Sequence, residues 1–252
     1  MRWGLWWVVI GLVVFFGLLI GTSLIFAIPS VRAAALSQVE LVNFGLSVLA
    51  YGGLLTVIVI ASRRRGLGNL AADFGLRFRP VDIAIGLGIG LGGRLFTGAL
   101  TGVTIGITGY TPPRGNFELS SGPLWIALNS VLIAAIVAPF VEELFFRGLL
   151  LRSVRNGVLR GKGRPQPAGP AVQRRAVILS ILVSGVGFML LHLYQADNLT
   201  FAIILGGSTL VVGLANARVA TRTGRLGGAI IAHVVFNGSA VLLAIVLEMA
   251  VV

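Results

Sequence analysis

Seven apolar runs of membrane-spanning length follow one another along this chain of 252 residues. A helix of about 20 apolar residues crosses the hydrocarbon core of a bilayer. Because that core holds no water to bind backbone polar groups, each run must form a helix, and the sequence lacks the short alternating repeats of a membrane β-barrel. The predicted spans cover approximately residues 5–28, 42–61, 81–104, 123–150, 176–194, 201–219 and 226–250.

The composition supports this class. Hydrophobic residues make up 56% of the chain, charged residues 11%, and the mean hydropathy is +0.98. A soluble globular domain carries about twice that share of charge. We therefore predict an all-α, polytopic membrane protein with a single transmembrane domain over residues 1–252, and the pattern leaves room for an eighth short or interfacial helix.

The distribution of positive charge predicts how the chain crosses the membrane. The net charge is +12, yet 17 of the 20 basic residues lie at the N-terminus, in alternate loops or at the span ends that adjoin those loops. Only Arg32 and Arg114 fall in the opposite loops, and Arg94 lies inside the third span. The positive-inside rule then predicts a cytoplasmic N-terminus and an external C-terminus. This pattern favours a multi-pass plasma-membrane protein over a nucleic-acid-binding one, and the preference for arginine over lysine hints at a bacterial source.

Two further features concern processing and redox chemistry. Arg2 and the apolar run after it resemble a signal peptide, but the run exceeds the roughly 7–15 residues of a signal core. We therefore expect a retained first helix. The chain has no cysteine, which rules out disulfides, a thiol nucleophile and a cysteine metal site.

Ionisable residues inside the apolar runs are the candidate functional groups. Glu142 and Glu143 lie side by side in the fourth run, and the only two histidines, His192 and His233, lie in the fifth and seventh. A charged group in hydrocarbon costs several kcal/mol, so such residues usually face a protein interior or a functional site.

Helical spacing separates the roles of the two glutamates. Glu143 and Arg147 are four residues apart and can form an ion pair, whereas Glu142 points about 100° away, on the face of Phe146. Glu142 is therefore suited to proton transfer. The alternative is that both glutamates pair with arginines and merely lock helices together, with Arg94 the nearest other arginine within a span.

The histidine-bearing runs show the same spacing. Phe188 and His192 share a helical face, as do His233 and Asn237. The Asn237 amide could donate to a developing oxyanion or form an interhelical hydrogen bond. At about 1.5 Å per residue, Glu142, His192, His233 and Asn237 could meet in the cytoplasmic half if the fifth helix begins outside the membrane.

Glycine-rich stretches and one loop complete the pattern. Gly86–Gly93 has some dinucleotide-motif character but lies within a span, so we interpret it and Gly206–Gly207 as helix-packing sites. Residues 156–173 contain three prolines and several glycines, which indicates a flexible cytoplasmic linker whose arginines could touch anionic lipid.

Three motifs together resemble one known family. Glu142-Glu143-Leu-Phe-Phe-Arg147 is similar to an E-E-x-x-x-R motif, Phe188 to His192 to F-x-x-x-H, and His233 to Asn237 to H-x-x-x-N. In this order they resemble the CPBP family of intramembrane proteases, which includes CAAX prenyl proteases and bacteriocin-processing Abi proteins. The region of resemblance predicts a catalytic core over residues 123–250.

The resemblance implies a glutamate protease that needs no metal or other cofactor. Glu142 with His192 would activate a water, and His233 with Asn237 would stabilise the oxyanion. Glu143, Arg147 and Phe188 would support these groups. The partners would be the lipid bilayer and a membrane-associated protein or peptide substrate, with its identity, its prenylation and the oligomeric state left open.

Three alternatives remain from the sequence. Glu142, His192 and His233 could instead ligate zinc in a metalloprotease. The chain could also be a non-catalytic immunity or scaffold protein that binds a peptide. A transporter is a third alternative, although the sequence shows no inverted repeat.

Overall fold

The computed structural model describes residues 3–109, 119–161 and 167–250, and the regular structure within these ranges is helical. Seven helices there are long and apolar enough to cross a membrane, which confirms the predicted number and the all-α class. They are α1 (Leu5–Phe26), α3 (Val39–Arg65), α5 (Val81–Thr108), a continuous helix over Pro123–Leu159, α9 (Pro170–Leu193), α10 (Leu199–Thr223) and α11 (Gly227–Met249).

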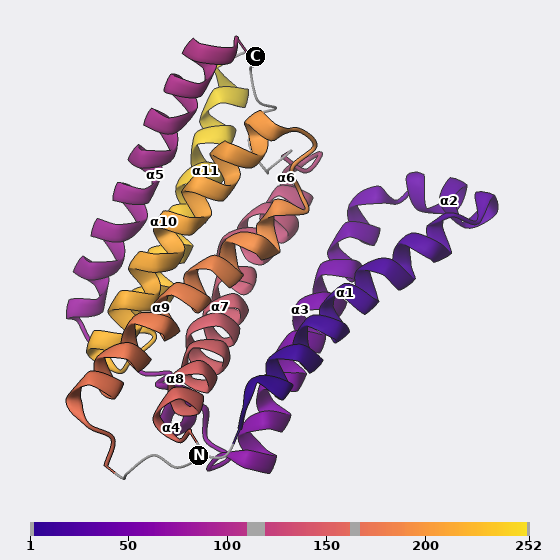
Figure 1. Ribbon diagram of the computed structural model, residues 1–252. Coiled ribbons are helices and arrows are strands. Elements are labelled where there is room, and N and C mark those ends of the chain that lie inside the picture. The colour runs from indigo at the N-terminus through magenta and orange to yellow at the C-terminus, as the bar shows by residue number, and fades with distance from the viewer. Residues whose placement is uncertain (1–2, 110–118, 162–166, 251–252) are drawn as a thin grey trace.

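Successive spans run in alternating directions. Helix α1 begins at the lower end in Figure 1 and α11 ends at the upper end. Helices α3, α8 and α10 end at the lower end, which we call the basic end because arginines lie in or directly after their last turns. Two short helices join the spans: α2 (Pro29–Leu36), which has no buried residue, and α4 (Leu70–Phe74).

The fourth span is one continuous helix whose hydrogen-bonding pattern changes along its length. It comprises α6 (Pro123–Trp125), the π-helical segment η1 (Ile126–Val137), α7 (Ala138–Glu143), the π-helical segment η2 (Leu144–Leu150) and α8 (Leu151–Leu159). Pro139, which has no N–H to donate, lies at the start of α7. Wide π turns occur often at functional sites, and here they flank the turn that carries both glutamates.

Glycines bring α5 close to α10 and α11. A Cβ atom added to Gly86 would lie 2.4 Å from Ile231, and one on Gly90 would lie 2.6 Å from the Ala232 carbonyl oxygen. A Cβ on Gly93 would lie 2.7 Å from Val212 of α10. The glycine-rich run is therefore a packing surface, as the sequence predicted.

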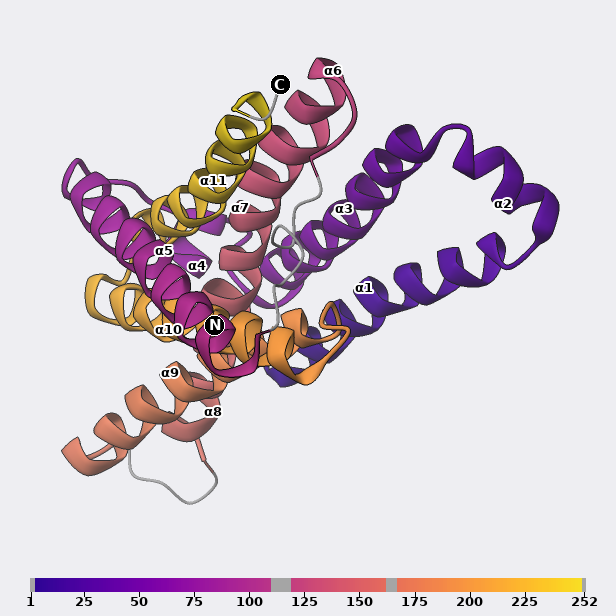
Figure 2. The same cartoon turned by 90° about the horizontal axis from the view of Figure 1, so that it is seen from above.

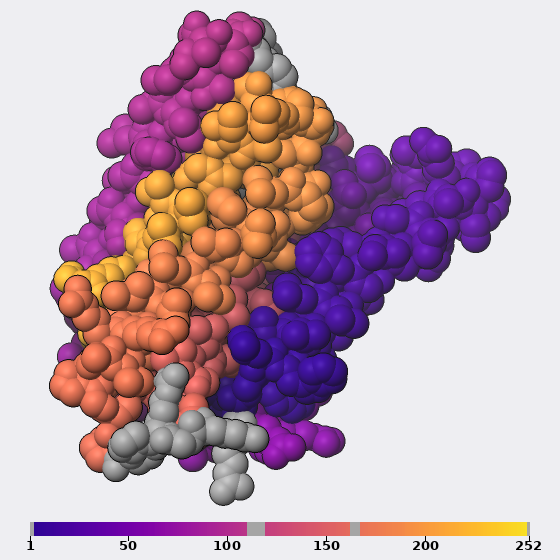
Figure 3. All heavy atoms as spheres, in the orientation of Figure 1, coloured from indigo at the N-terminus to yellow at the C-terminus, as the bar shows by residue number. Residues whose placement is uncertain are grey.

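Helices α1, α2 and α3 form an arm beside the other helices. At the basic end, α1 and α3 pack on η2, where a Cβ on Gly11 would meet the Phe145 ring at 2.4 Å. Their far ends and α2 project away from the body of the molecule (Figures 2 and 3). The middle of α3 thus remains close to α7, which positions Tyr51 beside Glu142.

Helix α9 begins six residues earlier than predicted, at Pro170 rather than residue 176. This earlier start agrees with the requirement that the fifth helix extend beyond the membrane edge at the basic end. His192 then lies in its last turn.

Candidate active site

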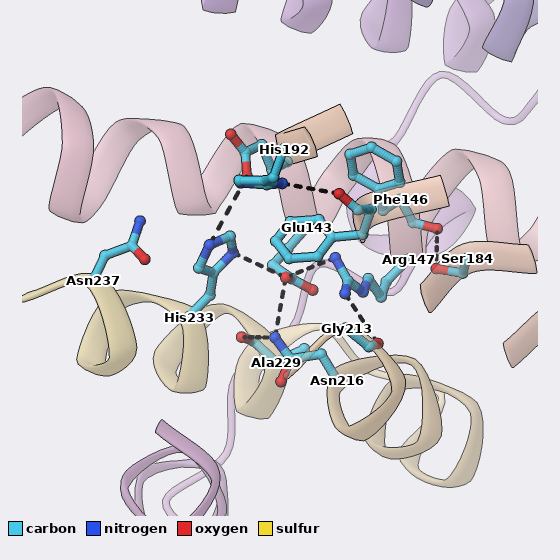
Figure 4. Close-up of polar contacts among 12 residues, drawn as sticks. Glu143, Phe146, Arg147, Ser184, His192, Gly213, Asn216, Ala229, His233 and Asn237 are labelled. Carbon is cyan, nitrogen blue, oxygen red and sulfur yellow. Dashed lines mark hydrogen bonds and ion pairs between the residues drawn. The ribbon is translucent and has the colours of Figure 1, made fainter. Parts of the chain in front are cut away.

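Glu143 is the centre of a buried polar network. Its Oε1 atom lies 3.0 Å from Nη1 of Arg147 and 3.1 Å from Nδ1 of His233, and it accepts a hydrogen bond of 3.1 Å from Nδ2 of Asn216. Both Glu143 and Arg147 are fully buried. The ion pair predicted from the four-residue spacing is therefore present between α7 and η2. Figure 4 shows that the contacts of Glu143 and Arg147 link this part of the fourth span to α10 and α11.

Glu142 has different partners. Its Oε1 accepts a hydrogen bond of 3.0 Å from the Tyr51 hydroxyl of α3. Its Oε2 lies 3.9 Å from Nε2 of His192 and 3.8 Å from Nε2 of His233. The two adjacent carboxylates thus face different environments, as their angular separation on the helix predicted: one binds an arginine, and the other faces both imidazole rings.

The hydrogen-bond partner of Nδ1 determines which nitrogen of each neutral imidazole ring carries the hydrogen. Nδ1 of His192 lies 2.9 Å from the Phe188 carbonyl oxygen, which can only accept, so this nitrogen carries the hydrogen. Nδ1 of His233 faces the Glu143 carboxylate and likewise donates. In both neutral rings, the Nε2 lone pair is consequently directed toward Glu142.

Phe188 forms the apolar wall of the cluster. Its ring centroid lies 4.5 Å from that of His192 and 5.2 Å from that of His233, and Cζ of Arg147 sits 4.4 Å from the same centroid. The Arg147 Nη2 also donates to the Gly213 carbonyl oxygen at 3.0 Å. One aromatic ring thereby packs against both histidines and the buried guanidinium.

Asn237 lies apart from the carboxylates. It is one turn beyond His233 on α11, and its Nδ2 donates to the Ala134 carbonyl oxygen of η1 at 2.9 Å. An amide NH₂ carries two hydrogens, so a second one remains available to donate. The structure therefore brings Glu142, Glu143, His192 and His233 into one cluster, with Asn237 beside it.

Two polar residues of this cluster were not predicted from the sequence. Tyr51 binds Glu142, and Asn216 is fully buried and donates to Glu143 and to the Ala229 carbonyl oxygen. Both lie within predicted membrane spans, where a polar side chain is itself a signal of an interhelical contact. Their spacing matches none of the three motifs, which is why motif reasoning missed them.

Arg94 does not pair with either glutamate in the described residues. Its Nη2 donates to the Phe236 carbonyl oxygen, its Nε donates to Ser239 at 3.2 Å, and its Cζ lies 4.3 Å from the Phe236 ring centroid. This arginine links α5 to α11. The alternative in which both glutamates bind arginines is therefore not what the structure shows.

Within residues 3–109, 119–161 and 167–250, no group of three or more histidine and carboxylate side chains is arranged to hold a metal ion.

Comparison with known proteins gives one match. The family model described as type II CAAX prenyl endopeptidase Rce1-like matches residues 123–239. Searches of curated proteins and of solved structures gave no match. The matched range contains both glutamates, both histidines and Asn237, which confirms the resemblance carried by the three motifs. Residues 123–239, somewhat less than half of the chain, are thus similar to the Rce1-like CAAX prenyl endopeptidases of the CPBP family.

Proposed function

We propose that this protein is a glutamate-type intramembrane endopeptidase that hydrolyses a peptide bond in a membrane-associated protein or peptide. The observation that supports this most directly is the position of Glu142 Oε2, which lies 3.8–3.9 Å from Nε2 of both histidines. Separations of this size exceed a direct hydrogen bond and suit a water molecule shared between the groups.

Glu142 and His192 are the groups that activate this water. The Glu142 carboxylate removes a proton as the water oxygen attacks the scissile carbonyl carbon, and the Nε2 lone pair of His192 orients the water by accepting its other hydrogen. The new C–O bond forms as one O–H bond breaks. When the C–N bond breaks, the proton passes from Glu142 to the leaving amine.

His233 and Asn237 stabilise the oxyanion in this proposal. His233 donates through Nε2 in its imidazolium form, which takes its second proton from solvent before the attack and keeps it through the reaction, while Nδ1 donates to Glu143. Asn237 donates through the amide hydrogen that Ala134 does not use. Donors aimed at developing charge in a dry site are worth about 3 kcal/mol each.

The groups around these residues hold them in place. Glu143 fixes the orientation of His233, and Arg147 and Asn216 fix Glu143. Tyr51 binds Oε1 of Glu142 and so directs Oε2 toward the histidines. The proposed catalytic core over residues 123–250 therefore receives one side chain from α3, outside the matched region.

Zinc-dependent hydrolysis is the competing mechanism, because a carboxylate and two imidazoles are possible zinc ligands. The ion pair of Glu143 with Arg147 and the resemblance to glutamate proteases favour the metal-free one. Exhaustive chelation followed by a turnover assay separates them. Unchanged turnover supports the proposal, whereas loss of turnover that one metal restores, with stoichiometric metal by elemental analysis, replaces it.

A substrate-independent experiment tests the activity itself. Membranes from a strain that lacks the protein are incubated with purified wild type or with the Glu142→Gln variant, and new peptide termini are quantified by mass spectrometry. The proposal expects a set of cleavages made by wild type and missing with the variant. If wild type produces no new termini, the peptide-binding or immunity alternative gains support.

A further inference from the structure

A second polar site lies at the basic end, away from the glutamates. It is a hollow of ≈ 570 Å³ between the α4–α5 linker, α8 and the α10–α11 turn. Four arginines from these three segments line it, namely Arg77, Arg79, Arg152 and Arg225. Phe78 and Gly224 also line it. We call this the arginine hollow.

The positive charge of the arginine hollow is only partly neutralised. Arg225 is paired with Asp82, at 2.7 Å from Nη2 to Oδ1. Arg152 donates to the Gly224 carbonyl oxygen at 3.1 Å, and its Nε has no hydrogen-bond partner in the described part of the chain. Asp73 lies nearby but is engaged by Ser62 and the Leu67 amide. Among described residues, the ion pairs do not include the guanidinium of Arg77 or Arg79, although Asp82 accepts a hydrogen bond of 2.8 Å from the Arg79 backbone N–H.

The walls of the hollow are held by backbone contacts. The Leu226 amide donates to the Gly75 carbonyl oxygen at 2.8 Å, and the Gly227 amide donates to the Arg77 carbonyl oxygen at 3.2 Å. Gly75 has φ +73°, and a Cβ there would lie 2.3 Å from the Gly224 carbonyl oxygen. The arginines therefore project from a backbone that is already positioned for a ligand.

Apolar surface continues from the rim of the hollow into the membrane. Phe78 in the linker, and Val81 and Ile83 at the start of α5, are each more than half exposed. Guanidinium groups bind phosphate oxygens through paired hydrogen bonds, and basic pockets at the ends of membrane helices bind lipid headgroups. A ligand with a phosphate beside acyl chains fits both surfaces at once.

We propose that the arginine hollow binds the phosphate headgroup of an anionic phospholipid whose acyl chains lie along the exposed start of α5. Two walls belong to helices of the glutamate–histidine cluster: Arg152 lies on the continuous helix that carries Glu142, and Arg225 directly precedes α11, which carries His233. An occupied hollow would therefore tie these helices together at the basic end. The proposal concerns binding and does not depend on proteolysis.

The test measures lipid binding by the full-length protein after delipidation in a neutral detergent. Phosphatidylglycerol and phosphatidylcholine are titrated, and retained lipid is counted by native mass spectrometry alongside the melting temperature. The variant Arg77→Gln/Arg79→Gln is compared with Arg64→Gln/Arg65→Gln, which removes equal charge from exposed residues at the same end, in the last turn of α3. Both variants change exposed side chains, and their melting temperatures without lipid check the fold.

The proposal expects the Arg77/Arg79 variant to bind phosphatidylglycerol about tenfold or more weakly, with the Arg64/Arg65 variant close to wild type. Equal losses in both variants would mean that general surface charge attracts the lipid, and would overturn the site. Equally tight binding of phosphatidylcholine would do the same. Inorganic phosphate that stabilises wild type as much as phosphatidylglycerol would assign the hollow to a soluble anion and overturn the lipid proposal.

Discussion

Replacement of Glu143 by glutamine should destabilise the protein strongly. The side chain keeps its shape and one acceptor oxygen but loses the charge that balances Arg147, which is fully buried 3.0 Å away. Removal of one partner from a buried ion pair costs about 3–5 kcal/mol, because the other charge stays in a medium that solvates it poorly. For a chain of this size, that cost corresponds to a fall in melting temperature of roughly 6–20 °C.

A double variant separates the charge effect from a packing effect. Glu143→Gln/Arg147→Met removes both charges and keeps the approximate volume, so it should melt above Glu143→Gln alone. Glu142→Gln is the matched control, because it makes the same chemical change on the neighbouring residue without leaving a buried arginine unpaired. All variants are measured by thermal denaturation in one detergent. The reasoning is refuted if Glu143→Gln melts with wild type, or if the double variant melts below the single one.

Three further predictions follow from the cluster and from the charge pattern. His192→Ala and His233→Ala should each abolish proteolysis with little loss of melting temperature, and wild-type turnover in either variant would make that histidine structural. Tyr51→Phe should lower kcat about 10–100-fold with KM nearly unchanged, because Oε1 of Glu142 loses a hydrogen bond to a charged group. Tyr51→Phe should have no further effect in a Glu142→Gln background, and the control variant Tyr194→Phe should stay near wild type. Reporter fusions at Asp197 and Val252 should both report the external side, and a cytoplasmic signal at either would contradict the proposed orientation.

Most of the fold follows from hydrophobicity alone. Membrane-length apolar runs define the helices, because the backbone of a single span can satisfy its hydrogen bonds in a lipid core only as a helix. The observed spans differ from the predicted ones at their ends; the fourth, for example, continues through α8 to Leu159. The π-helical segments around α7 were not predictable, because the same apolar residues suit either turn width.

The site was predictable where its residues share a helix. Glu143 and Arg147 meet through local spacing, and the motifs identified both histidines. Tyr51 and Asn216 reach the glutamates from α3 and α10, and such contacts depend on how distant segments pack. Local spacing carries no information about that packing.

The central claim is that Glu142 is the general base, and the rate of peptide-bond hydrolysis by Glu142→Gln tests it most directly. Purified wild type and variant are compared on one identified substrate, in one detergent, with melting temperature as the check on folding. Because the glutamine cannot accept the proton from water, hydrolysis should fall by about 10²–10⁴-fold while the protein stays folded and still binds the substrate. A folded Glu142→Gln protein that cleaves at the wild-type rate would contradict the account.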